Sequence, residues 1–259
     1  MKKILLLTIL MILSATSFAR DATLYSYDIL GVKLGMSEAE ARSILSKNLK
    51  KPVFEEITLT SFQTGSPYRG GFWAGVELTK EQDYSYSRSK YGIRLSQSVA
   101  VNIANGKVFA ISRYLSRMDA PILLDDLIKN LKTKYPEAGF TTNGETTDLI
   151  YDVDSKGKAF KDNELHVDVS ELNQCHTTPQ VATDSIHAAP ARIFIPNCSG
   201  SLAMNIWATT DKVGLSTVNW IKAVLVDSEV GMKNLKTLDL AEKERLINKT
   251  MKTKGKVDL

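Results

Sequence analysis

The sequence is poor in the residues that build most catalytic and metal sites. The chain of 259 residues holds two cysteines and three histidines. It contains no C-x-x-C pair, no H-x-x-x-H pair and no G-x-S-x-G motif, which are the local patterns of zinc sites, redox pairs and α/β-hydrolases. We therefore expect a protein that is not an enzyme and that uses no cofactor or metal.

Long apolar runs are equally scarce, and the one that occurs lies at the start of the chain. Residues 4–13 are almost entirely apolar, follow two lysines and precede the small-x-small sequence Ser17-Phe18-Ala19. This order is typical of a secretory signal peptide, residues 1–19, cleaved near Ala19. A retained anchor is the alternative, but about ten apolar residues cannot cross a hydrocarbon layer of roughly 30 Å. We predict a periplasmic or secreted protein without stable membrane insertion.

Neither sign of charge dominates the chain. Cleavage of the signal peptide removes two lysines and leaves 31 basic side chains against 29 acidic ones, a net charge near +2. The lysines are scattered except at residues 249–256, where a cluster is typical of a solvated helix end. A nucleic-acid partner is therefore not expected.

A glycine hinge followed by a capped helix is the clearest local pattern. Residues 28–34 have the composition of a short apolar strand, and Gly31 and Gly35 permit a bend there. Ser37 is a natural N-cap, and Glu40 three residues later completes a capping box. The helix that follows has one apolar face, formed by Ala41, Ile44 and Leu45.

The hinge G-V-K-L-G-M-S, residues 31–37, and the helix after it resemble a signature of bacterial envelope modules. Such modules occur in small outer-membrane assembly lipoproteins of the SmpA/OmlA type and in β-lactamase-inhibitor-like domains. The resemblance implies two helices against an antiparallel sheet and a function in binding other proteins. The chain departs from the assembly lipoproteins because no cysteine follows the apolar run to accept a lipid.

A β-rich stretch follows the helix. Residues 53–62, 71–78, 93–103 and 107–115 have the composition of strands. The strongest signal is Asn105-Gly106, since both residues accept the positive φ angles of a type I′ hairpin turn. We expect residues 20–117 to form one lobe, a helix plus an antiparallel sheet.

The second half repeats this order. Asp119 is the expected N-cap of a helix that Pro136 ends, and the helix has apolar residues at i, i+3, i+4 and i+7. Strands are expected at residues 148–153, 164–172, 202–209 and 216–227, and a terminal helix at 229–251. The sequence therefore predicts an α+β fold of two helix-plus-antiparallel-sheet lobes, the second at residues 118–259. A tandem duplication is one explanation for the repeated order.

The two cysteines, Cys175 and Cys198, flank a loop rich in small and polar residues. In an exported protein they are expected to form a disulfide, which stabilises by roughly 3 kcal/mol in the chain-entropy model. Metal binding is the alternative, because His176 and His187 lie in the same loop and share zinc-ligand chemistry. The spacing lacks a chelating pair, so we favour the disulfide.

A second candidate for chemistry is the polar series His166, Asp168 and Ser170. Alternation with apolar residues places the three on one strand face, about 7 Å apart. A working triad needs contacts of roughly 2.6–3.2 Å. We therefore expect a solvated strand face there rather than a hydrolase site.

Aromatic residues and arginines gather between residues 62 and 91. Phe62, Phe72 and Trp73 are expected in the core, and so are Trp207 and Trp220 further along the chain. Tyr and Arg side chains are typical of protein-protein hot spots. The candidate partner-binding residues are Tyr84, Tyr86, Arg88, Tyr68 and Arg69.

Three functions remain open from the sequence. The first is a non-catalytic exported protein that binds another envelope or secreted protein, as assembly accessory or inhibitor. The second is a cell-envelope hydrolase, which requires His166 or His187 to meet an acid and a nucleophile. The third is a small-ligand carrier, which requires a large apolar cavity. We favour the first.

Overall fold

The computed structural model of the chain describes residues 21–60, 67–77, 87–88, 94–116, 121–154, 158–159 and 198–254. The helices are α2 (Ala22–Ser26), α3 (Glu38–Asn48), α4 (Leu124–Lys134) and α6 (Ser228–Lys254). The strands are β1 (Val53–Thr60), β2 (Pro67–Glu77), β3 (Ser87–Arg88), β4 (Arg94–Ala104), β5 (Lys107–Ser116), β6 (Gly139–Asn143), β7 (Thr146–Asp154), β8 (Cys198–Thr210) and β9 (Ser216–Asp227). The predicted mixture of helices and antiparallel strands is confirmed.

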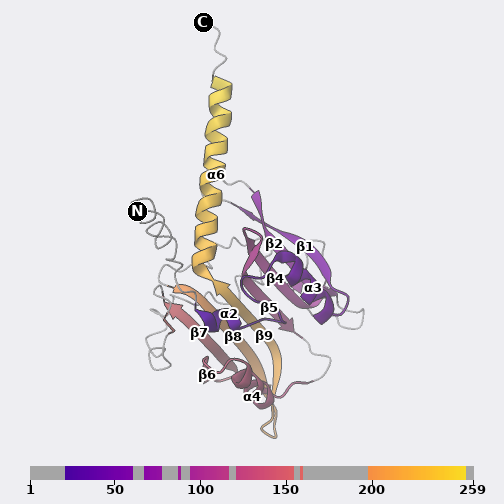
Figure 1. Ribbon diagram of the computed structural model, residues 1–259. Coiled ribbons are helices and arrows are strands. Elements are labelled where there is room, and N and C mark those ends of the chain that lie inside the picture. Colours follow the sequence, from indigo (N-terminus) through magenta and orange to yellow (C-terminus); the bar gives the residue numbers. More distant parts are fainter. Residues whose placement is uncertain are drawn as a thin grey trace, which may run out of the picture.

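All of these strands belong to one antiparallel sheet (Figure 1). The order is β1-β2-β4-β5-β9-β8-β7-β6, and the short β3 pairs with β4. Each half of the chain runs as a meander, and the last strands of the two halves, β5 and β9, pair with each other. The sheet therefore continues across the predicted lobe boundary.

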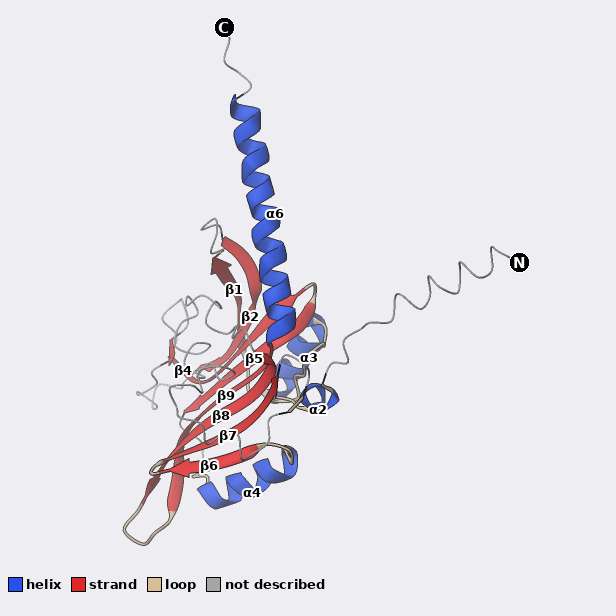
Figure 2. Cartoon of the chain, turned by 90° about the vertical axis from the view of Figure 1, so that its left-hand side faces the viewer, coloured by secondary structure: helices blue, strands red, loops and turns tan. Residues whose placement is uncertain are grey.

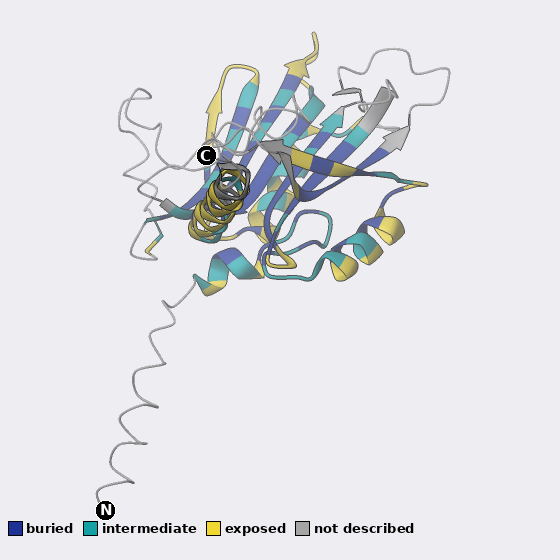
Figure 3. Ribbon diagram, turned by 90° about the horizontal axis from the view of Figure 1, so that it is seen from above, coloured by how far each residue is buried: buried dark blue, intermediate teal, exposed yellow. Residues whose placement is uncertain are grey.

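Three helices cover one face of the sheet. Figure 2 shows α2, α3 and α4 on the same side, and their apolar residues join those of the strands in the main core. Figure 3 shows buried residues along the strands and exposed residues along α6. The largest fully buried side chains of this core include Tyr135, Phe72, Leu45 and Ile111.

The capping box of α3 is confirmed, whereas the strand predicted before it is wrong. Ser37 Oγ accepts from Glu40 N at 3.3 Å, and Glu40 Oε2 accepts from Ser37 N at 2.8 Å. Upstream, Ile29 and Val32 pair across a tight turn in which Gly31 has φ +83°. The turn directs Ile29 and Val32 into the main core, where both are buried, although neither belongs to a strand.

The hairpin between β4 and β5 is confirmed. Asn105 has φ +51° and Gly106 has φ +73°. Both angles are in the left-handed region that the type I′ turn requires. The turn therefore aligns Ala104 with Lys107, and an irregularity between Asn102 and Ile103 shifts the register of the pairs beyond it.

The predicted N-cap of α4 at Asp119 is wrong, because the helix starts later. α4 begins at Leu124, and Leu123 occupies the N-cap position without a side-chain hydrogen bond. The preceding residues are extended and pair with β9: Val218 N donates to Ile122 O at 2.9 Å. Backbone pairing with the sheet thus delays the helix, which ends before Pro136 as predicted.

The second half contains one strand that the sequence analysis missed, β6, which pairs with β7. The strands predicted near β7, β8 and β9 are confirmed, and so is the terminal helix. The strand predicted at 164–172 lies outside the described residues. α6 follows β9 directly and extends beyond the sheet (Figure 1).

Candidate binding face

The candidate site lies on the sheet face opposite α2, α3 and α4, which we call the second face. Its members follow from strand register: Trp73 pairs with Ala100, which pairs with Ser112, which pairs with Val224. Residues opposite one another in a sheet point to the same side. Near the start of α6, this face has a small apolar cluster of its own that includes Val224 and Val230.

An aromatic cluster with a central lysine occupies the middle and the β8–β9 end of the second face. Trp207 and Trp220 are cross-strand partners, with ring centroids 6.3 Å apart. Lys222 Nζ lies 5.0 Å from the Trp220 centroid and 5.8 Å from that of Tyr114. Both distances are within the range of cation–π attraction. We call Tyr114, Trp207, Trp220 and Lys222 the aromatic–lysine cluster.

The aromatic–lysine cluster is accessible in part. Trp207, Trp220 and Lys222 are half-buried, whereas Tyr114 is 8% exposed. The polar residues beside it are held by hydrogen bonds: Trp207 Nε1 donates to Glu145 Oε2 at 2.9 Å, and Asn205 Nδ2 donates to Asp148 Oδ1 at 2.5 Å. These bonds fix the indole edge and the amide, so the cluster presents a preorganised surface.

The first half contributes buried polar groups to the second face. Glu55 pairs with Trp73 in the register of β1 and β2, and it is only 6% exposed. Within the described residues, neither of its carboxylate oxygens has a hydrogen-bond partner, and the Ser112 hydroxyl has none either. A buried carboxylate without a partner is costly. Such groups in a native fold call for an explanation, of which a ligand is one.

Of the predicted partner-binding residues, only Arg69 has a described side chain, and it lies beside α3. Arg69 Nη2 lies 2.6 Å from Glu38 Oε1, and Arg69 also pairs with Glu56. Arg42 joins both carboxylates at 2.7 Å each. The hydrogen bond from Arg69 and that from Arg42 lower the pKa of Glu38 to about 2. Arg69 therefore joins β2 to α3 within the fold.

The other candidates cannot be placed in a site. Tyr68 belongs to β2 and Arg88 to β3, and only their backbones are described. Tyr84, Tyr86 and Cys175 lie outside the described residues, and Cys198 begins β8. The disulfide therefore stays a prediction.

The aromatic–lysine cluster was missed because both tryptophans were assigned to the core. The sequence did indicate this cluster, because polar and aromatic residues alternate with apolar ones along β8 and β9. Trp207 is two residues from Asn205, and Trp220 is two residues from Lys222, whereas the intervening Ile206 is fully buried. Aromatic residues that share a strand face with polar residues belong to a partly exposed surface.

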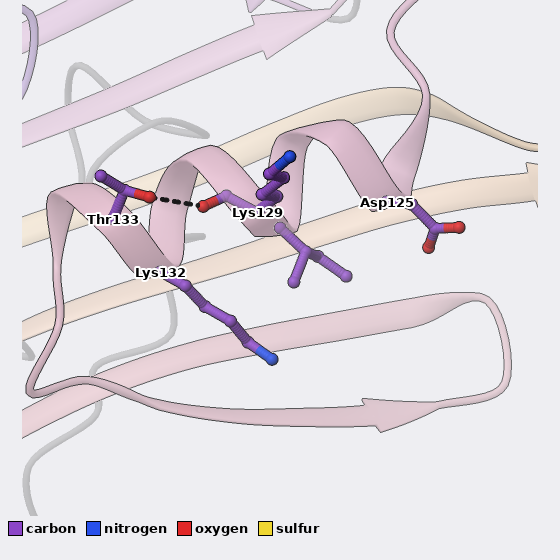
Figure 4. A pocket seen from close by; sticks show the side chains of 5 residues that line it. Asp125, Lys129, Lys132 and Thr133 are labelled. Atoms are coloured by element: carbon purple, nitrogen blue, oxygen red, sulfur yellow. Dashed lines mark hydrogen bonds between the residues drawn. The ribbon is translucent and has the colours of Figure 1, made fainter.

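A shallow hollow of about 420 Å³ lies on the outer side of α4. Figure 4 shows its side chains spread along the helix, with Thr133 Oγ1 donating to the Lys129 carbonyl at 3.1 Å. The lining residues are Asp125, Ile128, Lys129, Lys132 and Thr133. They do not converge on one point, so this hollow offers no geometry for catalysis.

The described part of the chain contains neither a metal site nor a membrane-spanning helix. No group of three or more His, Cys, Asp or Glu side chains there could hold a metal ion. No helix in these segments has the length and apolar character needed to span a membrane. Outside the described segments lie the polar series His166, Asp168 and Ser170 and the other two histidines, His176 and His187.

Comparison of this chain with protein-family models, with curated proteins and with solved structures gave no match.

Proposed function

We propose that the chain is an exported, non-catalytic protein that binds another protein of the cell envelope or its surroundings through the second face. The observation that carries this proposal is the aromatic–lysine cluster, where two half-buried tryptophans and a lysine stand side by side. Tryptophan and tyrosine dominate the binding energy of protein interfaces, because they combine a large area with a polar group. The protein would act on its partner as an assembly accessory or as an inhibitor.

The unequal distribution of helices over the two faces of the sheet supports the second face as the binding surface. α2, α3 and α4 pack on one face, whereas among the described helices only the start of α6 packs on the second face, which leaves the strand surface around the aromatic–lysine cluster for a partner.

We infer further that the two halves arose by tandem duplication. Each half has a helix of 11 residues before its meander of four strands. In each, the helix N-cap residue bridges to the start of the last strand, Ser37 to Lys107 and Leu123 to Thr217. The residue before each cap accepts from that strand, since Val108 N donates to Met36 O and Val218 N to Ile122 O. Matching non-local contacts of this kind support a common origin.

The test is affinity capture from an envelope extract of the source cells. The mature protein is compared with the variant Trp220→Ala/Lys222→Ala and with the control Lys129→Ala/Lys132→Ala on α4. We expect a partner in near-stoichiometric amount, with affinity reduced about 30-fold or more in the first variant and unchanged in the control. Equal capture by all three proteins would reject the second face as the binding surface.

A further inference from the structure

The helix-covered face of the sheet carries a basic residue at an unusual position. Arg113 lies on β5, between Ile111 of the main core and Leu115, which packs against the apolar cluster under α4. β5 pairs with β9, so Arg113 stands beside the junction of the two halves. A guanidinium thus occupies the boundary between two apolar clusters.

In the described part of the chain, Arg113 meets no opposite charge. The side chain is half-buried, and burial lowers the pKa of Arg113 to about 10. Arg42, Arg69 and Lys134 each pair with a carboxylate, but within the described residues no carboxylate pairs with Arg113. Burying a charge without a counter-charge costs free energy that an apolar residue would not.

One neighbour orients the guanidinium. With the Gln97 amide turned so that its oxygen faces Arg113, Oε1 accepts from both Nε and Nη2 at 3.0 Å. The phenol of Tyr135 lies nearby and donates its hydrogen bond to the Asp28 carbonyl at 2.6 Å. Two of the five N–H donors of Arg113 are therefore occupied, and the end formed by Nη1 and Nη2 keeps its outward donors.

We propose that Arg113 binds an oxyanion, the carboxylate or phosphate group of a ligand, on the helix-covered face. The end of a guanidinium matches two oxygens of such a group, and paired N–H···O bonds to an anion are among the strongest in proteins. Gln97 holds the guanidinium plane and leaves that end available. The site is separate from the second face and does not depend on the function proposed for it.

The experiment measures thermal unfolding of the mature protein at constant ionic strength, with inorganic phosphate, with acetate, and with chloride as reference. We expect at least one of the two oxyanions at 100 mM to raise the Tm of the wild type by about 2 °C or more over chloride. The shift should vanish in Arg113→Gln and persist in Lys129→Gln, a control on α4. An equal shift in Arg113→Gln, or no shift with either anion, would overturn the proposal.

A second readout covers the case in which Arg113→Gln fails to fold. The arginine Nε–Hε resonance of Arg113, identified by its loss in Arg113→Lys, is followed in ¹⁵N–¹H spectra during both titrations. We expect it to move saturably with the oxyanion that raises the Tm. If it stays in place while other arginine resonances move, the anion binds elsewhere and the assignment to Arg113 is wrong. Phosphate and acetate together distinguish the two ligand classes.

Discussion

Glu38 connects α3 to the sheet through ion pairs. It accepts from Arg42 of the same helix and from Arg69 of β2, and Glu56 of β1 completes the network. The Arg42 guanidinium also lies 4.1 Å from the centroid of Phe72, a fully buried ring. Two glutamates and two arginines thus link α3, β1 and β2.

Replacing Glu38 by Gln should reduce stability at pH 7 by about 1 kcal/mol, since the network is partly exposed to solvent. The pKa of Glu38 is lowered to about 2, so its contribution is complete above the unfolded value near 4.5. That contribution is lost as pH falls through the interval from about 4.5 to 2. Thermal unfolding at pH 7 and at pH 2 measures the difference, which should be present at pH 7 and nearly absent at pH 2.

A matched control for this variant is Glu244→Gln on α6, an exposed glutamate. It should change the Tm by less than a degree or so at either pH, as most exposed substitutions do. If the Glu38 variant lost the same stability at both values of pH, the ion pairs would not be the cause.

At the scale of elements, α6 is the helix that extends beyond the sheet (Figure 1). Its start is fixed by Asp227, whose Oδ1 accepts from Val230 N at 2.8 Å, and by the packing of Val230. Further along, Leu240 is 59% exposed and Ile247 is 51% exposed. An isolated helix of this kind is marginal in water.

A chain that ends after residue 239 should therefore keep its fold, with a Tm within about 2 °C of the full chain. As a positive control, Leu45→Ala in α3 removes a fully buried side chain and should cost about 2–5 kcal/mol. Calorimetry of the three proteins makes the comparison. A fall of more than about 5 °C in the shortened chain would show that the outer half of α6 is part of the cooperative unit.

The elements that could be predicted are those fixed by local chemistry. The capping box at Ser37 and the turn at Asn105-Gly106 act within a few residues, so the sequence alone defines them. The start of α4 could not be predicted, because the pairing of Ile122 with β9 is a contact between distant segments. The pairing of β5 with β9 is non-local in the same way, and so is the alignment of Trp207 with Trp220.

At the scale of the whole molecule, one sheet has two faces with different roles. One is covered by α2, α3 and α4 and forms the main core, while the other carries the aromatic–lysine cluster and the unpartnered Glu55. The joining of two meanders through β5 and β9 makes this surface continuous across the strands of both halves. A partner on the second face could therefore contact both halves at once.

The most direct test of this account is site-specific photo-crosslinking in the source cells. A photoreactive residue is placed at position 209, an exposed position on β8 two residues beyond Trp207, or at position 129, an exposed position on α4. Both variants are first shown to unfold at the same temperature. The account predicts a discrete protein adduct from position 209 and none from position 129. Adducts of the same size from both positions, or an adduct from position 129 alone, would contradict it.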